Sequence, residues 1–292
     1  MKKLLFIINP KAGLKKNRHF IDNAVDVFEK SGYKVGIKYT KKRADGTDIA
    51  RHYGSKADLV VCLGGDGTLN EVMQGMIEGG VKTPLGYIPA GSTNDFATSL
   101  GLKSDPKEEA EFIVSREARP LDLGQFNGRY FVYTASAGIF TKTSYSTPQD
   151  LKNRLGHFAY ILTGVKELFH IRRLKLKIEL DDRTIEGKYI FAAINNATKV
   201  GGIMKLDENL VRFNDGVFEL MLVEFPRGPL EFLKLAGQVL MQKFTGKITL
   251  IQIDSANITA ESDVDWSLDG EKEKGKETVD FKVIHDAINF IY

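Results

Sequence analysis

Residues 59–77, LVVCLGGDGTLNEVMQGMI, join an apolar run to a segment of helical period through a glycine-rich turn. The run at 59–63 is apolar throughout, as a parallel strand buried on both faces should be. Beyond the turn, five apolar residues recur at the spacing of one helix face: Leu69, Val72, Met73, Met76 and Ile77. Gly79-Gly80 ends this pattern. The stretch therefore predicts a buried strand, a glycine loop and a helix that packs on the sheet.

The same alternation extends through the first 120 residues. Further apolar runs lie at 4–8, 34–39 and 84–89, and further helical segments at 20–28, 47–54 and 106–115. Strands that alternate with helices are typical of a parallel sheet covered by helices. We therefore predict an α/β domain over residues 1–122.

Strand patterns dominate after Pro120. They lie at 121–126, 129–136, 174–181, 184–194, 217–225 and 248–253, with helical stretches near 151–169 and 229–243. Turn signals such as Asn127-Gly128 and Asp181-Asp182 join them. We predict a second, β-rich domain of sandwich or barrel type over 123–283. A last apolar strand, at 287–292, could belong to either domain.

Composition narrows the classes of function. A chain of 292 residues with 42% hydrophobic content is long for one domain. Its net charge of +3 is too mild to indicate a nucleic-acid partner. The single cysteine, Cys62, lies in an apolar run and indicates a reducing, cytoplasmic setting. The short N-terminal apolar run ends in Asn-Pro, which argues against a signal peptide. No window approaches the ~18–20 apolar residues that span a bilayer, so we expect any membrane contact to be peripheral.

Three loops with unusual chemistry follow predicted strands. They read NPKAG at 9–13, GGDGTLNE at 64–71 and AGSTNDFA at 90–97. In parallel sheets, ligands bind beyond the carboxyl ends of the strands. The glycines of the second loop let backbone amides approach a ligand, and the helix that follows offers its positive end to phosphate. Asp66 would be unfavourable beside phosphate unless a cation lies between them, so it indicates Mg²⁺ and phosphoryl transfer.

The second loop also fits a purely structural interpretation. Gly-Asp-Gly-Thr is an ordinary strand-to-helix connection, and Thr68 with Glu71 matches a capping box. Three such loops on one sheet favour function, because a merely structural sheet has no need for all of them. The spacing matches neither the dinucleotide fingerprint G-x-G-x-x-G nor the Walker A loop.

Together, NPKAG, GGDGTLNEV and GSTNDFA resemble the motifs of the soluble, diacylglycerol-kinase-like lipid kinases of bacteria. Later matches are the glycines at 201–202, FNDG at 213–216 and LDGE at 268–271. GGDGT alone is shared with NAD kinases and 6-phosphofructokinases. The resemblance implies a doubly wound nucleotide-binding domain of the NAD-kinase and phosphofructokinase type, followed by a β-sandwich-like lipid-substrate domain. It also implies that residues 284–292 return to complete the first domain.

The resemblance further implies ATP and Mg²⁺ as cofactors. The expected nucleotide-binding positions are Asn9, Pro10, Lys11, Ala12, Gly13, Thr40, Gly64, Gly65, Asp66, Gly67, Thr68, Leu69, Asn70, Glu71, Ser92 and Thr93. Asp66 would serve the catalytic metal and phosphates, and the loop holding Asp269 and Glu271 would supply the base that deprotonates the acceptor hydroxyl. A structural Mg²⁺ would bind Asp215 and the backbone oxygens of Arg212 and Val217.

The residues by themselves leave two points open. LDGEKEKG is typical of a solvated hairpin turn, and nothing in it chooses between Asp269 and Glu271 as the base. The chain also departs from the family pattern before Asp215, where Asn209, Val211 and Asn214 replace the usual Pro, Ala and Asp.

The segment at 153–177 couples an apolar helix to a basic cluster. As a functional surface, Arg172, Arg173, Lys175 and Lys177 could rest on anionic lipid. As structure, the helix packs on the second sheet and the basic side chains of the next strand face water. We favour the structural interpretation for the apolar face, and the sequence leaves the basic cluster undecided.

We therefore expect an ATP- and Mg²⁺-dependent kinase acting on the hydroxyl of diacylglycerol or a similar neutral lipid, giving a phospholipid such as phosphatidic acid. Its expected place is the cytoplasm, peripheral at the inner membrane surface, and a homodimer is an open alternative for its assembly. Competing hypotheses are a kinase with another acceptor, either a sphingoid base or NAD, and a non-catalytic regulator that binds nucleotide or lipid.

Overall fold

The computed structural model describes residues 1–12, 19–91, 94–139, 173–200, 204–206 and 211–292. The chain folds as mixed α/β structure, as expected. It forms two compact units. Unit 1 comprises Met1–Leu123, Phe213–Gly216 and Ile284–Tyr292, and unit 2 comprises Gly124–Arg212 and Val217–Val283. No helix among the described residues combines the length and the apolar character needed to cross a membrane.

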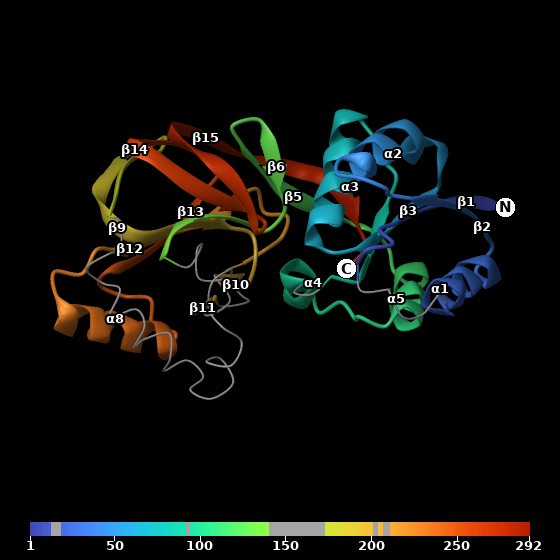
Figure 1. Cartoon of the computed structure of the whole chain (residues 1–292), viewed down its shortest axis with the longest axis horizontal. Coiled ribbons are helices and arrows are strands. Elements are labelled where there is room, and N and C mark those ends of the chain that lie inside the picture. The colour runs from blue at the N-terminus through green and yellow to red at the C-terminus, as the bar shows by residue number, and fades with distance from the viewer. Residues whose placement is uncertain (13–18, 92–93, 140–172, 201–203, 207–210) are drawn as a thin grey trace. The chain divides into compact units, whose positions relative to one another are not determined.

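Unit 1 contains a parallel sheet in the order β4-β3-β1-β2 (Figure 1). Its strands are β1 (Lys2–Ile8), β2 (Tyr33–Tyr39), β3 (Leu59–Gly64) and β4 (Leu85–Pro89). The register sets Ile8 beside Leu63, and Leu63 beside Ile88. Since β1 and β3 are inner strands, their predicted apolar runs are buried on both faces. The carboxyl ends of β1, β3 and β4 thus meet at one edge of the sheet.

Helices cover both faces of this sheet. In Figure 1, α1 (His19–Lys30) and α5 (Pro106–Ser115) lie on one side, and α2 (Asp45–Tyr53) and α3 (Asp66–Glu78) on the other. Phe28 of α1 and Ile113 of α5 share an apolar cluster with Phe6 of β1. A 3₁₀ turn, η1 (Gly54–Lys56), follows α2, and a short helix, α4 (Asp95–Leu100), follows β4. The sequence patterns did not predict α4.

Helix α5 illustrates how local sequence sets an element. Its N-cap, Asp105, accepts hydrogen bonds from the backbone amides of Lys107 and Glu108, at 3.0 Å each. Pro106 occupies the first helical turn, where a missing amide costs no intrahelical bond. The helix spans the predicted residues 106–115, because both its cap and its apolar period are local signals.

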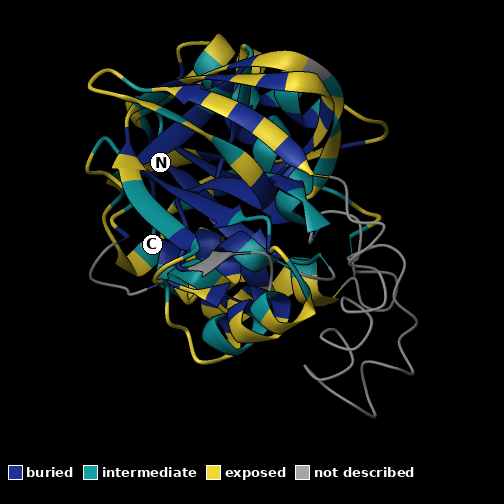
Figure 2. Cartoon of the chain, turned by 90° about the vertical axis from the view of Figure 1, so that its left-hand side faces the viewer, coloured by how far each residue is buried: buried dark blue, intermediate teal, exposed yellow. Residues whose placement is uncertain are grey.

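Unit 2 is an antiparallel assembly around its own core. Its strands are β6 (Arg129–Phe131), β7 (Thr134–Gly138), β8 (Leu174–Glu179), β9 (Thr184–Asn195), β10 (Lys199–Val200), β11 (Met204–Lys205), β12 (Phe218–Glu224), β13 (Ile248–Ile253) and β14 (Ser255–Leu268), together with the end of β5 (Arg119–Phe126) and most of β15 (Glu271–Phe290). Both β9 and β14 pair with β7 and with β8, at different points along their length. Figure 2 shows the alternation of buried and exposed residues along the outer strands. Helix α8 (Pro229–Leu240) packs on this unit through Phe232, Leu235 and Val239.

The last two strands form a long hairpin about the turn that LDGEKEKG indicates, although the sequence patterns predicted neither β14 nor the first part of β15. Strand β14 pairs with β15 through a turn at Asp269-Gly270. The far end of β15 lies in unit 1, where Phe290 pairs with Leu85 of β4 and the amide of Ile291 donates to the Leu85 carbonyl at 2.9 Å. Residues 284–292 therefore extend the parallel sheet of unit 1.

Candidate active site

The loops that follow β3 and β4 are packed backbone against backbone. A Cβ added to Gly91 would lie 2.7 Å from the Cα of Gly65, and one added to Gly65 would lie 3.3 Å from the Cα of Gly91. The amide of Ala90 donates to the carbonyl of Gly64 at 2.7 Å. Glycine is thus required at Gly91, because no side chain fits between the loops. The second and third predicted loops form one structure.

The side chains of Tyr87 and Asn94 hold these two loops in place through hydrogen bonds. The buried Tyr87 hydroxyl donates to the Gly64 carbonyl at 3.1 Å and lies 3.5 Å from Oδ1 of Asn94. Asn94 adopts a left-handed backbone with φ of 50°, and its side-chain amide bonds both the N–H and the carbonyl of Gly91, at 2.9 Å each. Burial, reinforced by Asp66, raises the pKa of Tyr87, so its hydroxyl stays protonated as a donor.

The first loop is tied to the second through Asn9. Its side-chain amide donates to the hydroxyl of Thr68 at 2.9 Å, and its Oδ1 accepts from the amide of Lys11 at 3.0 Å. The predicted capping box is therefore wrong. Helix α3 begins two residues before Thr68, at Asp66, with Gly65 as N-cap, and no described side chain caps it. Thr68 lies inside the first turn and faces Asn9.

Glu71, the other member of the expected capping box, serves a different helix. Its carboxylate accepts from the amides of Ala44 at 2.8 Å and Gly46 at 3.1 Å, where α2 begins. Asp45 holds the preceding turn, since its carboxylate accepts from the amides of Lys41 and Lys42. These two bonds lower the pKa of Asp45. The turn after Thr40 is thereby fixed next to α3.

Asp66 stands where the loops meet. Its Oδ2 accepts from the amide of Asp95 at 3.1 Å, which links the start of α3 to the start of α4. Loops that approach closely enough to exclude side chains, at the uncapped N-terminus of a thirteen-residue helix, can receive phosphate oxygens. The carboxylate beside them is suited to a hard divalent cation.

Gly13, Ser92 and Thr93 lie outside the described residues. The Leu69 side chain is 1% exposed and belongs to the core, so any ligand contact would have to come from its backbone. Thr40 is nearly buried, and its amide donates to the carbonyl of Ile8 at 2.9 Å. The other described candidates of the first two loops lie at the carboxyl edge of the sheet, as predicted: Asn9, Pro10, Lys11, Ala12, Gly64, Gly65, Gly67 and Asn70.

A second acidic region of unit 1 surrounds the turn 213–216, which carries Asp215. Asp122 is fully buried, and its Oδ2 accepts from the amide of Gly216 at 2.7 Å. Its Oδ1 accepts from the amide of Asp286 at 2.8 Å and contacts Nδ1 of His285 at 2.9 Å. Asp122 thus joins three segments that are far apart in sequence. Nothing in the sequence marks Asp122 as special, because PLDLG at 120–124 looks like an ordinary strand.

In unit 2, Asp269 is a structural carboxylate. It is 7% exposed and accepts from the amides of Val132 at 2.7 Å, Tyr133 at 3.0 Å and Thr134 at 3.1 Å. Its φ is 48° and that of Gly270 is 83°, the left-handed pair that a tight hairpin turn needs. Three backbone donors thus hold the buried carboxylate against the chain.

Glu271 differs from Asp269 although it lies only two residues away. Its side chain is 41% exposed and accepts from Nη2 of Arg129 at 2.6 Å. Glu273 takes the other guanidinium nitrogen of Arg129, Nη1, at 2.7 Å. Burial acts to lower the pKa of Arg129, but the bonds to Glu273 and Glu271 outweigh it and raise that pKa. Of the two carboxylates proposed as the base, Glu271 is the accessible one.

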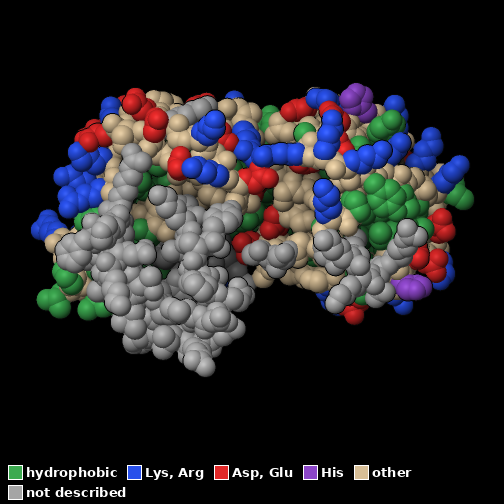
Figure 3. Space-filling model, viewed as in Figure 1, with side chains coloured by type: hydrophobic (Ala, Val, Ile, Leu, Met, Phe, Trp, Pro, Cys, Tyr) green, Lys and Arg blue, Asp and Glu red, His purple; other side chains and the backbone are tan. Residues whose placement is uncertain are grey.

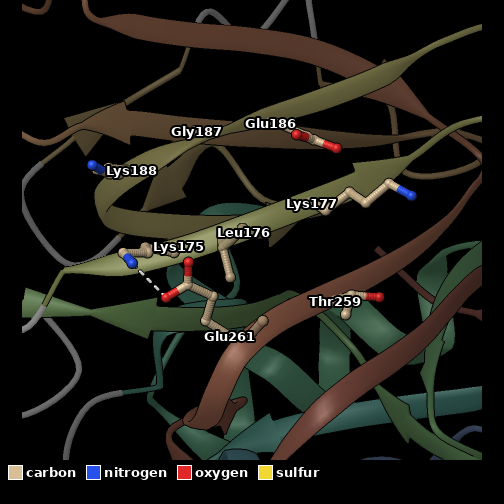
Figure 4. Close-up of a pocket in the computed structure, with 9 residues that line it drawn as sticks. Lys175, Leu176, Lys177, Glu186, Gly187, Lys188, Thr259 and Glu261 are labelled. Carbon is tan, nitrogen blue, oxygen red and sulfur yellow. Dashed lines mark hydrogen bonds and ion pairs between the residues drawn. The ribbon is translucent and has the colours of Figure 1, made fainter.

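The basic cluster proposed for lipid contact is partly described. Lys175 and Lys177 lie on β8, whose residues alternate between buried and exposed, so both lysines face water. Together with Lys188, they line a pocket of about 450 Å³ on the sheet (Figure 4). Nζ of Lys175 lies 2.5 Å from Glu261 of β14.

Other members of the cluster also have partners within the protein. Lys177 donates to Glu179 at 2.6 Å, and the Arg173 guanidinium lies 4.5 Å from the centre of the Phe225 ring. The structure thus supports the structural interpretation for these side chains. Arg172 and the helix expected at 151–169 lie outside the described residues.

A parallel sheet with glycine loops and a carboxylate at its carboxyl edge is typical of phosphate-binding proteins of the α/β class. Residues 3–126 match the family model described as the diacylglycerol kinase catalytic domain. A diacylglycerol kinase of Bacillus subtilis (strain 168) is 32% identical over 277 residues, which are 93% of this chain and 90% of that protein. A diacylglycerol kinase of Staphylococcus epidermidis is also 32% identical over 277 residues, covering 92% and 86% of the two chains.

Solved structures agree on the fold. The crystal structure of a diacylglycerol kinase from Bacillus anthracis (Sterne) superimposes with a TM-score of 0.79 over 100% of this chain and 97% of the other, at 24% identity. The chain therefore belongs to the bacterial diacylglycerol kinase family and is a lipid kinase. The resemblance inferred from NPKAG, GGDGTLNEV and GSTNDFA is confirmed.

Proposed function

We propose that the protein transfers the γ-phosphoryl group of ATP, with Mg²⁺, to the hydroxyl of diacylglycerol or a similar neutral lipid, giving phosphatidic acid or its analogue. The observation that carries this proposal is the interlocking of the two glycine loops around Gly65 and Gly91, beside Asp66. Unit 1 would bind the nucleotide and unit 2 the lipid. Its relatives are named for diacylglycerol, which supports that acceptor.

The nucleotide would lie along the carboxyl edge of the parallel sheet. Backbone amides at the start of α3 would bind phosphate oxygens, and the positive end of the helix would favour their charge. Asn9, Tyr87 and Asn94 contact the loops themselves, so we assign them the role of holding the phosphate-binding backbone in place. Such preorganisation is what phosphoryl transfer asks of an enzyme, since positioning and charge neutralisation supply most of the catalysis.

Oxygen ligands suit the metal in two places. Asp66 offers a carboxylate at the phosphate loops, where Mg²⁺ would neutralise charge on the transferred group. Asp215 offers another on the turn whose glycine amide is held by Asp122. A structural Mg²⁺ there would add the backbone oxygens of Arg212 and Val217, which are hard ligands of the kind this ion prefers.

Glu271 is our candidate for the base that takes the proton from the acceptor hydroxyl. Its carboxylate is exposed enough to meet a substrate, and Arg129 holds it in one orientation. Asp269 is engaged by three backbone amides, so we assign it the role of fixing the turn from which Glu271 projects. One carboxylate then acts chemically while the other sets its position.

The test is turnover of ATP with diacylglycerol in mixed micelles. Asp66→Ala should lower the rate by about a hundredfold or more, because the metal and phosphates lose a charge partner. Asp48→Ala, an exposed aspartate of α2, is the matched control and should leave the rate unchanged. Equal rates for wild type and Asp66→Ala would overturn the proposal.

A panel of acceptors identifies the substrate. Under the same assay, wild-type enzyme is offered diacylglycerol, a sphingoid base and NAD. We expect phosphatidic acid to be the main product. Faster transfer to the sphingoid base or to NAD would reject diacylglycerol as the acceptor, and tight nucleotide binding without any transfer would reject the proposed reaction.

A further inference from the structure

Helix α8 carries a row of apolar side chains that face away from the protein. Leu230 is 85% exposed, Leu233 48% and Leu240 39%, and Met241, directly after the helix, is 65% exposed. Their spacing of three, seven and one residues places them on one side of the helix. Figure 3 shows hydrophobic side chains gathered at the lower left, where Figure 1 places α8. We call Leu230, Leu233, Leu240 and Met241 the α8 apolar row.

The opposite side of α8 accounts for its attachment to unit 2. Phe232, Leu235 and Val239 are buried, with exposures of 7%, 4% and 8%. The α8 apolar row therefore adds nothing to this packing. A helix that is apolar on both sides, with one side in the core, offers the second side to something outside the unit.

Charge around the row points to the chemistry of that partner. Arg227, Lys234 and Lys243 are all exposed. Glu231 is the one acidic residue in the sequence between 227 and 246, and it contacts Lys247 at 3.7 Å. Basic side chains flanking an exposed apolar row are typical of a helix that lies in the headgroup region of an anionic bilayer. Lysine is depleted at protein interfaces, which argues against a second protein chain.

We propose that the α8 apolar row inserts into the surface of a bilayer that contains anionic phospholipid, with Arg227, Lys234 and Lys243 contacting the headgroups. This inference rests on the proposed function in one respect, because a diacylglycerol acceptor resides in such a bilayer. It assigns membrane contact to α8, whereas the sequence left the role of the basic cluster at 172–177 undecided.

The experiment measures binding of the whole protein to vesicles by sedimentation. Vesicles of phosphatidylcholine and phosphatidylglycerol in equal parts are compared with vesicles of phosphatidylcholine alone. Wild-type protein should bind the anionic vesicles more tightly. Leu230→Gln/Leu233→Gln/Met241→Gln should weaken that binding by about tenfold or more, because apolar burial is lost. Glutamine keeps the helix propensity of leucine, so α8 should still form.

A second variant isolates the charge. Lys234→Gln/Lys243→Gln should weaken binding to anionic vesicles by roughly fivefold per lysine and leave binding to neutral vesicles unchanged. Matched controls away from α8 are Ile37→Gln, an exposed apolar residue of β2, and Lys30→Gln/Lys107→Gln on α1 and α5. Both controls should bind as wild type does. Should the triple variant fail to fold, Leu230→Gln alone, at the most exposed position, gives the same test.

Activity on a short-chain diacylglycerol dissolved as monomers separates this inference from the proposed function. Variants of α8 that lose vesicle binding but phosphorylate the soluble substrate at the wild-type rate would support both. Unchanged vesicle binding in the triple variant would overturn the inference while leaving the kinase reaction intact. Binding that depends on α8 in a protein without kinase activity would support the inference and reject the function. A dimer that becomes monomeric in the triple variant, with unchanged vesicle binding, would assign the row to a second copy of the chain.

Discussion

Two of the four Asp-Gly dipeptides in this sequence, at 66–67 and at 269–270, serve opposite purposes. At 66–67 the dipeptide opens helix α3, and Asp66 accepts a hydrogen bond from the amide of Asp95 in a neighbouring loop. At 269–270 it forms a hairpin turn, and Asp269 receives three amides and is buried. The first carboxylate stands at the carboxyl edge of the parallel sheet, between two loops. The second is enclosed by its own backbone.

The conformation of the backbone around each carboxylate explains this difference. A helical start at Asp66 directs amides outward from the loop, toward a ligand. A left-handed pair at Asp269-Gly270 turns the chain back, so that the amides of 132–134 are bonded by the side chain. The accessible acid of the second turn is then the next residue but one, Glu271.

The largest effect should come from removing the charge of Glu271. Glu271→Gln keeps a hydrogen bond to Arg129 but cannot accept the proton of the acceptor hydroxyl, so kcat should fall by about a hundredfold to a thousandfold. Glu273→Gln is the matched control, since it removes the charge of the neighbouring acid on the same arginine while keeping an acceptor oxygen, and should stay within roughly threefold of wild type. Equal losses in the two variants would reassign the effect to the orientation of Arg129.

Asp269→Asn should instead destabilise the fold. Asparagine tolerates the left-handed backbone but offers one acceptor oxygen and a donor, so at least one of the three amides loses its partner. The free energy of unfolding should drop by about 2–4 kcal/mol in a denaturant titration. Asp280→Asn, exposed on β15, should change it little. A large loss of kcat per folded molecule without a loss of stability would make Asp269 the catalytic acid.

The sequence predicted the elements near Asp66 better than those near Asp269. The apolar period of a helix and the apolar run of a buried strand are local patterns. The helix at 106–115 and the strand at 59–63 could therefore be predicted directly from the sequence. Strand β14 was missed because acidic residues such as Glu261 and Asp263 interrupt its apolar alternation. The pairing of Arg129 with Glu271 joins residues 142 positions apart, which no local pattern can show. Tyr87 was readable in principle, as a hydroxyl in an otherwise apolar strand just before a glycine loop.

Tyr87→Phe tests whether the loop that carries Asp66 depends on the hydrogen bond from the Tyr87 hydroxyl to the Gly64 carbonyl. The ring stays packed, and the Gly64 carbonyl loses one of its two donors while the amide of Ala90 remains. We expect KM for ATP to rise by roughly threefold to tenfold, the worth of one hydrogen bond, with a smaller change in kcat. Tyr189→Phe, a buried tyrosine of unit 2, should leave KM unchanged. A drop in stability alone, with wild-type KM, would limit Tyr87 to packing.

Glu109 extends the comparison to a buried carboxylate with little support. It is 1% exposed, its Oε2 accepts from the amide of Lys103 at 2.8 Å, and its Oε1 has no hydrogen-bond partner among the described residues. Burial therefore raises the pKa of Glu109 above its ordinary 4.5, an effect that the bond from Lys103 only partly offsets.

Because the folded protein holds this proton more tightly than the unfolded chain, the wild type should lose stability as pH rises from 4.5 through the folded-state pKa. Glu109→Gln has no carboxyl proton to lose at this position. Its free energy of unfolding, relative to that of the wild type, should therefore rise with pH by less than about 2 kcal/mol and stay constant above the folded-state pKa. Denaturant titrations between acid and neutral pH measure the difference. Glu111 is exposed on the same helix, so the free energy of unfolding of Glu111→Gln should change with pH as that of the wild type does. If the stability of Glu109→Gln changed with pH as that of the wild type does, a single amide would suffice to keep a buried carboxylate charged. The number of amides around Asp269 would then not explain its difference from Asp66.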